Sequence, residues 1–203
     1  MRESSEEIVV ALDVPRNRLP PTTKFRSTWI VASQNALRNC GYFDRYLSLL
    51  PEAHRQALTT TVVGGWLPIE VALAHYLACD RMGLDTDAIA QIGEILTRHL
   101  NNTFLSIAGR FAKQVGATPW VPLSYSRRIW DRMCIGGAIV VYKEGPKEAR
   151  VEVLECALAA IPYFRAGLRD IGMGVGKLFC DVLYVKELPR RSPTTIVYRA
   201  SWV

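Results

Sequence analysis

Long apolar runs are missing from this sequence of 203 residues. A membrane-spanning helix needs about 18 or more consecutive apolar residues, and the sequence has no such stretch. Near its start the chain carries charged residues, among them Arg2, Glu3 and Glu6, and it lacks the apolar core of a signal peptide. We therefore expect a cytoplasmic protein without a membrane span.

Closely spaced cysteine pairs are also missing. The cysteines are odd in number, lie far apart and form no CxxC motif: Cys40, Cys79, Cys134, Cys156 and Cys180. A disulfide framework or a zinc knuckle needs closer pairing than this. The spacing therefore favours buried thiols in a reducing compartment.

Catalytic motifs are missing as well. The sequence contains no HExxH motif, no catalytic spacing of paired carboxylates and no Ser/His/Asp order. The glycine-rich run at 172–177 is not a phosphate-binding loop, because Ile171 stands where the first glycine belongs and Leu178 replaces Ser or Thr. We expect the protein not to be an enzyme and predict no catalytic residue.

Positive charge is present but spread out. The formal net charge is +6 at pH 7, and the arginines occur in small groups along the chain. A nucleic-acid-binding protein usually gathers its charge into one stripe or one helix face. The distribution therefore argues against nucleic acid as a partner.

Hydrophobic residues make up 49% of the chain, enough for one sizeable core. Residues 1–24 contain Pro15, Pro20 and Pro21, which favour extended chain, so an N-terminal arm is predicted there. The rest, 25–203, is predicted to form a single domain. Its helical part covers 25–135 and its sheet-bearing part covers 136–203.

Glycine and proline residues divide the helical part into short helices. Asp85 is a suitable N-cap, and Gly83 is a suitable residue just after a helix end. Pro68 suits a first helical turn, where its missing N–H is not needed. Helices are predicted over 33–38, 43–50, 52–59, 66–82, 85–99, 103–115 and 119–133.

The apolar period then changes from about 3.6 to 2. Ile135–Val141 with Val151–Cys156 predicts one hairpin, and Phe179–Glu187 with Thr195–Trp202 predicts a second. Residues 161–178, between them, predict an amphipathic helix. The predicted fold class is therefore α+β, with an N-terminal helical bundle followed by a small antiparallel sheet of two hairpins and a covering helix.

Scattered aromatic, glycine and proline positions carry a resemblance to a known group of proteins. The segments are Ala36-Leu37, Gly41-Tyr42-Phe43-Asp44, Leu49-Leu50-Pro51-Glu52, Gly65-Trp66-Leu67-Pro68, Ile92-Gly93, Arg110-Phe111-Ala112, Trp130 and Pro162-Tyr163-Phe164-Arg165-Ala166-Gly167. They resemble a myxobacterial paralogous family of uncharacterised proteins. The architecture resembles the superfamily of heme nitric-oxide-binding domains, vinyl-reductase-like domains and TRAPP vesicle-tethering subunits. The resemblance covers about residues 25–203 and implies a ligand pocket between the helices and the sheet.

The resemblance also bears on the cofactor. Heme-binding relatives use a proximal histidine and a Tyr-x-Ser-x-Arg anchor for the heme carboxylates. This chain has Tyr125-Ser126-Arg127-Arg128, which lacks that spacing. On this comparison heme is possible but not favoured, and the cofactor stays unknown.

Histidine and cysteine supply the candidate metal or iron ligands. His75 and Cys79 lie four apart, so they share one face of a predicted helix and have the donor atoms for a soft metal or a heme iron. The alternative is a core face on which His75 bonds a backbone carbonyl. His99 continues the apolar stripe of Ile89 and Leu96, where it is either a ligand or a core or helix-end residue.

The helix before the sheet supplies the other candidates. Tyr125, Arg128 and Trp130 lie there, and arginine forks suit carboxylates or phosphates. The sequence predicts either an anionic ligand at this helix start or a solvated face with one buried tryptophan.

Three functions remain open from the sequence. The first is a non-catalytic small-molecule-binding, sensory or regulatory module with an apolar pocket between helices and sheet, signalling through a protein partner or a homodimer. The second is a ligand-free structural or assembly adaptor that acts through a protein interface. The third is a heme or metal sensor.

Overall fold

A computed structural model describes the backbone of residues 7–100 and 118–203, and the side chains of the same residues except 99 and 100. The helices in these ranges are α1 (Ser27–Asn39), α2 (Phe43–Leu49), α3 (Glu52–Thr59), α4 (Ile69–Arg81), α5 (Thr86–Leu100), α7 (Trp120–Ser124), α8 (Ser126–Met133) and α9 (Pro162–Gly176). Single 3-10 turns lie at Arg16–Arg18 and Ala157–Ala160.

The strands form two antiparallel sheets. The larger has five strands in the order β1-β5-β6-β8-β7: β1 (Glu7–Val10), β5 (Ala138–Gly145), β6 (Glu148–Leu154), β8 (Ile196–Trp202) and β7 (Leu183–Leu188). The smaller has three strands in the order β3-β2-β4: β3 (Trp66–Pro68), β2 (Lys24–Arg26) and β4 (Cys134–Ile135).

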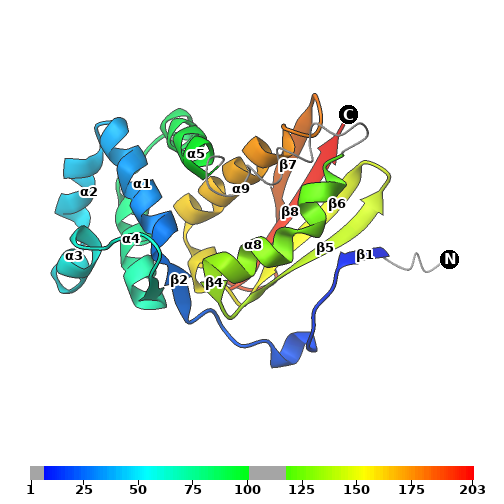
Figure 1. Ribbon diagram of the computed structural model, residues 1–203, viewed down its shortest axis with the longest axis horizontal. Helices are drawn as coiled ribbons and strands as arrows, with labels where there is room; N and C mark the ends of the chain where they lie inside the picture. The colour runs from blue at the N-terminus through cyan, green and yellow to red at the C-terminus, as the bar shows by residue number, and fades with distance from the viewer. Residues whose placement is uncertain (1–6, 101–117) are drawn as a thin grey trace.

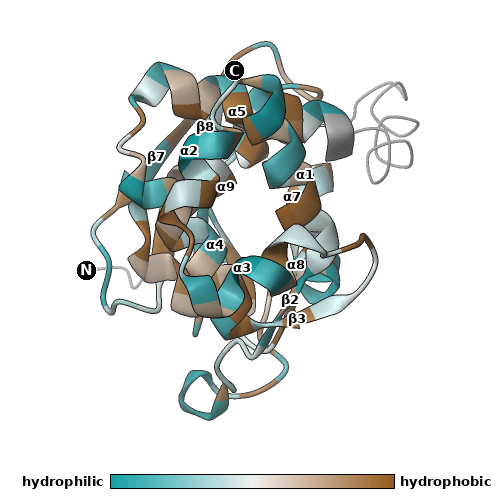
Figure 2. Ribbon diagram, turned by 90° about the vertical axis from the view of Figure 1, so that its left-hand side faces the viewer, coloured by the Kyte–Doolittle hydropathy of each residue, from teal (hydrophilic) through white to brown (hydrophobic). Residues whose placement is uncertain are grey.

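The elements are arranged as a helical end and a sheet-bearing end (Figure 1). Helices α1 to α4 pack together at one end, while α8 and α9 lie over one face of the five-stranded sheet. The helical ribbons alternate between hydrophobic and hydrophilic segments, as expected when one side of each helix is buried (Figure 2). The predicted α+β class, including both hairpins and the covering helix, is confirmed.

Three predicted helices differ from the structure. The one expected over 33–38 is longer and spans Ser27–Asn39. The one expected over 66–82 begins only at Ile69, because Trp66–Pro68 is extended and pairs with β2. The one expected over 119–133 is two helices that meet at Tyr125. The helix expected over 103–115 lies outside the described residues.

The predicted arm is docked along the sheet where the structure describes it. Strand β1 pairs with β5, and Val10 packs in a small core with Val141 of β5 and Trp202 of β8. The boundary at residue 24 as a domain limit stays a prediction. None of the helices described over 7–100 and 118–203 is long and apolar enough to cross a membrane.

Candidate functional site

An apolar cavity of about 200 Å³ lies between the α7–α8 segment, α9 and the sheet. The sequence led us to expect an apolar pocket at this place. The sheet contributes residues from four strands, among them Ile139, Val151, Val153, Leu183, Val185 and Tyr198. The helices contribute, among others, Leu123, Ile129, Trp130, Leu168, Gly172 and Val175.

The periodicity of the sequence builds these walls. Val151 and Val153 alternate with charged residues along β6, so their side chains point to one face of the sheet. On α9, Leu168, Ile171 and Val175 are spaced three and four apart and line one side of the helix. The apolar face of the sheet and the apolar side of α9 therefore face each other across the cavity.

The cavity opens between α8 and α9. Ile129 of α8 is 39% exposed, and Gly172 of α9 is also exposed, although both line the cavity. Deeper in, Trp130 and Val153 are buried. These two helices lie over the same face of the sheet (Figure 1), so an entering molecule passes between them to reach the sheet.

A few polar groups face the cavity. The Oγ atom of Ser126 is buried and has no hydrogen-bond partner, which is uncommon for a buried hydroxyl. Arg169 lines the cavity, and its guanidinium pairs with Asp170 at 2.8 Å. The Tyr198 hydroxyl donates to the carbonyl of Arg165 at 2.6 Å, and burial raises its pKa, so it stays neutral. Ser126 and Arg169 thus offer a hydroxyl and a cation to a ligand.

His75 and Cys79 lie elsewhere, in the core of the helical end. Nδ1 of His75 lies 2.7 Å from the Tyr46 hydroxyl, and Nε2 lies 3.0 Å from Oγ of Ser33. Burial lowers the pKa of His75 to about 3 and raises that of Cys79, so both are neutral near pH 7. Neither residue lines the cavity. The expected core face is present, although His75 bonds two hydroxyls where a backbone carbonyl was expected.

The other predicted site residues do not form one site either. His99 lies in the last turn of α5, and its side chain is outside the described part. Tyr125 is 47% exposed, and the Arg128 guanidinium lies over its ring at 5.3 Å from the centroid. Neither lines the cavity, whereas Trp130 does and donates from Nε1 to the carbonyl of Gly136 at 3.1 Å.

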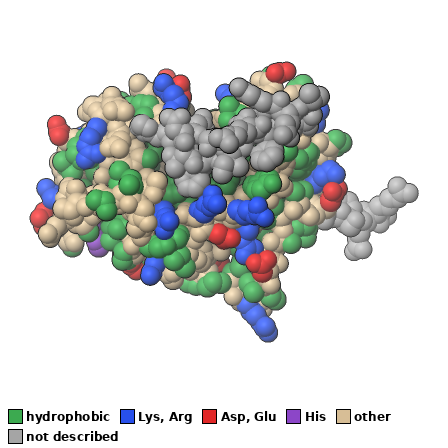
Figure 3. Space-filling model, in the orientation of Figure 1, with side chains coloured by type: hydrophobic (Ala, Val, Ile, Leu, Met, Phe, Trp, Pro, Cys, Tyr) green, Lys and Arg blue, Asp and Glu red, His purple; other side chains and the backbone are tan. Residues whose placement is uncertain are grey.

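Among the described residues, no three His, Cys, Asp or Glu side chains are grouped as metal ligands. On the face shown in Figure 3, several Lys and Arg side chains lie close together near the centre, with Asp or Glu beside them, and others are scattered among hydrophobic side chains. The apolar cavity is therefore the candidate functional site.

No protein-family model and no curated protein matches this sequence. The myxobacterial resemblance consequently stays a prediction.

Solved structures of H-NOX domains share the fold. An oxygen-binding H-NOX domain related to soluble guanylate cyclases has a TM-score of 0.59 at 10% identity, and the match covers 87% of this chain and 94% of that one. The Fe(II) unliganded H-NOX protein from K. algicida has a TM-score of 0.58 at 8% identity, covering 88% and 96%. An H-NOX structure from a study of heme distortion has a TM-score of 0.59 at 9% identity, covering 87% and 94%. At such identities the likeness shows the fold alone.

These neighbours correct the expectation about the cofactor. The sequence argument did not favour heme, because the Tyr-x-Ser-x-Arg spacing is absent. The structural neighbours are nevertheless heme proteins, so that expectation is wrong. A missing anchor motif removes one way of holding heme carboxylates, but the motif says nothing about the cavity, which is assembled from distant segments.

Proposed function

We propose that this chain is a non-catalytic sensor domain that binds heme in the cavity between α8, α9 and the sheet. The observation that carries the proposal is this apolar cavity, in a fold shared with heme-binding domains. Bound heme would supply an iron centre that takes a small gaseous ligand. The chain itself would hold the porphyrin, exclude water from it and transmit the structural change that follows ligand binding.

The chemistry of the described walls fits a porphyrin. Its flat faces are apolar, and the sheet and helices present aliphatic and aromatic side chains to them. Arg169 carries a planar guanidinium that can bond a propionate in a fork, and Ser126 has a free hydroxyl nearby in the cavity lining. In this chain these two residues would take the part of the missing anchor motif.

The size of the cavity adds a condition. A cavity of about 150 Å³ holds benzene, so about 200 Å³ holds only part of a porphyrin. Heme binding therefore requires the walls of the cavity to move apart, and we assign this movement to the α7–α8 segment. A change in this wall on binding is the physical basis of sensing in this proposal.

Hemin titration tests the site, with absorbance in the Soret region as the readout. Gly172→Leu is expected to weaken hemin binding at least about tenfold, because the side chain would occupy the cavity mouth. Its Cβ would meet no atom within 4 Å, and replacing a helical glycine stabilises a helix by about 0.5–1 kcal/mol, so the fold is kept.

Gly167→Leu is the matched control. Gly167 is also on α9 with open space around its Cβ, but it lines only a smaller neighbouring cavity, which shares Leu168 and Ile171 with this one. Its hemin affinity is expected to equal that of the unchanged protein. Absence of a Soret band in the unchanged protein, or equal affinity in both variants, would contradict the proposal.

We further infer that His99 is the protein ligand of the iron. The chain has three histidines. His75 is engaged on both ring nitrogens, and His54 lies on α3 and lines no part of the cavity. Helix α5, which carries His99, packs directly on α9, one wall of the cavity.

His99→Ala is expected to change the spectrum of the reduced heme, and added imidazole is expected to restore it. Met133→Leu is the control, because Met133 lines the cavity and carries the alternative soft donor. If Met133→Leu alters the spectrum and His99→Ala does not, the thioether is the ligand and the assignment to His99 is wrong.

A further inference from the structure

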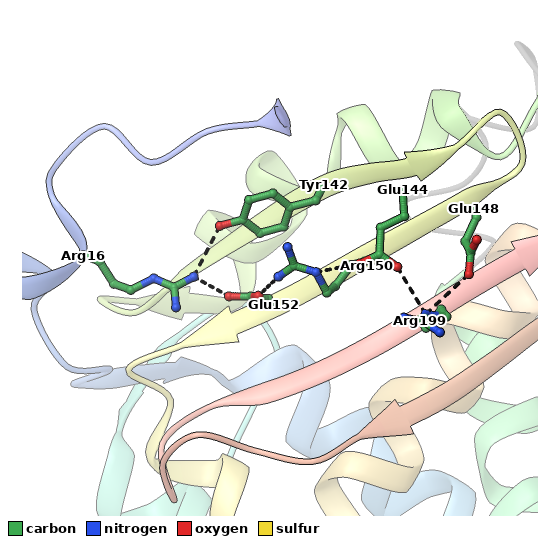
Figure 4. A network of polar contacts seen from close by, with 7 residues as sticks. All are labelled: Arg16, Tyr142, Glu144, Glu148, Arg150, Glu152 and Arg199. Atoms are coloured by element: carbon green, nitrogen blue, oxygen red, sulfur yellow. Dashed lines mark hydrogen bonds and ion pairs between the residues drawn. The ribbon is translucent and has the colours of Figure 1, made fainter. Parts of the chain in front are cut away.

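The N-terminal segment of residues 7–18, which we call the strap, crosses the edge and the outer face of the sheet. It is held by the backbone pairing of β1 with β5, by the packing of Val10 and by several ion pairs. Lys143 pairs with Glu7 at 2.8 Å, Arg127 pairs with Asp13 at 2.6 Å, and Arg16 pairs with Glu152. Figure 4 shows Arg16 reaching Glu152 over the sheet.

Glu152 gives this attachment its chemical importance. Glu152 is only 4% exposed. Its register partners on the neighbouring strands, Val140 and Val197, are also buried. Two cations compensate its charge, Arg16 from the strap and Arg150 from its own strand. Removing one partner of a buried carboxylate is unfavourable, so the strap end is held where it is.

The rest of the strap is weakly held. Strand β1 has four residues and an irregular register between Ile8 and Val10. Ile8 is 53% exposed and Val14 is also exposed, whereas Val10 is buried and Val9 packs partly buried against the same small core. Segments with so little buried apolar surface open locally at low free energy.

The strap also contacts the movable wall of the cavity. Asp13 binds Arg127 of α8, and the adjacent Ser126 lines the cavity. Val10 belongs to the same small core as Leu123 of α7, another lining residue, and as Trp202 of β8. The strap therefore ties the α7–α8 segment to the sheet from outside.

We propose that the strap couples the cavity to the β5 edge: a ligand that moves the α7–α8 segment away from the sheet loosens the strap and uncovers β5. By reciprocity, a strap that is locked in place weakens ligand binding by the same factor. The inference rests on the proposed function for the identity of the ligand and for the movement of the α7–α8 segment. Its output would be a free strand edge, a surface that readily pairs with another strand.

A reversible disulfide between the strap and β5 tests the coupling. Glu7 and Lys143 are register partners with exposed side chains, so Glu7→Cys with Lys143→Cys has suitable geometry. Cys40 and Cys180, the half-exposed native thiols, are changed to serine in every variant. Two probes are titrated separately, hemin and the aromatic anion anilinonaphthalene sulfonate.

Oxidation is expected to weaken binding of the probes about tenfold relative to the reduced form of the same protein. The control disulfide is Tyr184→Cys with Ser201→Cys, register partners on β7 and β8 away from the strap. It is expected to leave both affinities unchanged. As an independent readout, amide exchange of residues 141–143, which pair with β1, is expected to rise when a probe binds.

The outcomes separate the two proposals. If hemin does not bind but oxidation weakens binding of the sulfonate, the heme proposal fails and the coupling stands. If hemin binds equally well to the oxidised and reduced forms, the coupling fails and the heme proposal stands. If neither probe binds, both are overturned.

Discussion

Acidification from about pH 6.5 to about pH 4.5 is expected to lower the free energy of unfolding by about 2 kcal/mol through His75 alone. The folded-state pKa of His75 is about 3, because the ring is completely buried, while the ordinary value is 6.5. Below pH 6.5 the unfolded chain takes up a proton that the folded protein does not. Stability therefore falls with pH until the folded pKa is reached.

The hydrogen bonds of the Tyr46–His75–Ser33 cluster explain why the His75 ring stays neutral in the folded protein. In the neutral ring one nitrogen donates and the other accepts, and each has a hydroxyl partner. Gln34 joins the cluster, because its Nε2 donates to the Tyr46 hydroxyl at 3.4 Å and to the carbonyl of Leu58 at 3.0 Å. A second proton on the ring would place an uncompensated charge in the core.

Urea unfolding at several pH values measures this effect, with His75→Gln as the comparison. The variant is expected to be less stable near pH 7, because it loses one of the two hydrogen bonds, by about 1–3 kcal/mol. Its stability is expected to fall less steeply below pH 6.5. Other acidic groups titrate equally in both proteins, so parallel curves for the two would contradict the assignment to His75.

Gly136→Ala is expected to destabilise the protein by more than about 4 kcal/mol or to prevent folding. Gly136 has φ +83°, a conformation that side chains disfavour. Its added Cβ would lie 2.1 Å from the carbonyl oxygen of Pro21, a backbone atom that cannot turn away. Helix α8, strands β4 and β5 and the segment after the strap meet at this point, so the strain would displace all of them.

Gly41→Ala separates the cost of the positive φ from the cost of the contact with Pro21. Gly41 has φ +75°, but its Cβ would meet nothing within 4 Å. The backbone preference alone costs about 1–2 kcal/mol, and this is the whole effect expected there. Thermal unfolding of both variants makes the comparison. Equal losses would show that the contact with Pro21 relaxes and that the close approach is unimportant.

Periodicity and capping residues predicted the helices and strands whose sequence signals lie within one short segment of the chain. The N-cap at Asp85 is confirmed, since its Oδ1 accepts the N–H of Ala88 at 2.8 Å. Both hairpins and α9 follow from alternation and helical spacing. The three-stranded sheet was missed because β2 pairs with β3 and β4, whose residues are far away in the chain, and each strand is too short to show a period.

The candidate site was predictable only in part. Trp130 lines the cavity as a buried aromatic residue of the predicted helix, whereas Tyr125 and Arg128, close in sequence, do not. Ser126 and Arg169 were missed. The four-residue spacing of His75 and Cys79 correctly places them on one face of a helix, but spacing cannot say whether that face meets a cavity or a core.

The sequence by itself determined the α+β class, the order of helices and hairpins and the lack of known catalytic motifs, because these depend on periodicity, capping and residue type along short stretches. Only the tertiary structure decided which apolar faces leave a cavity, that both nitrogens of His75 are occupied, and that the strap closes over Glu152. Those features join residues that are distant in the chain, and local sequence patterns do not show which distant residues come together.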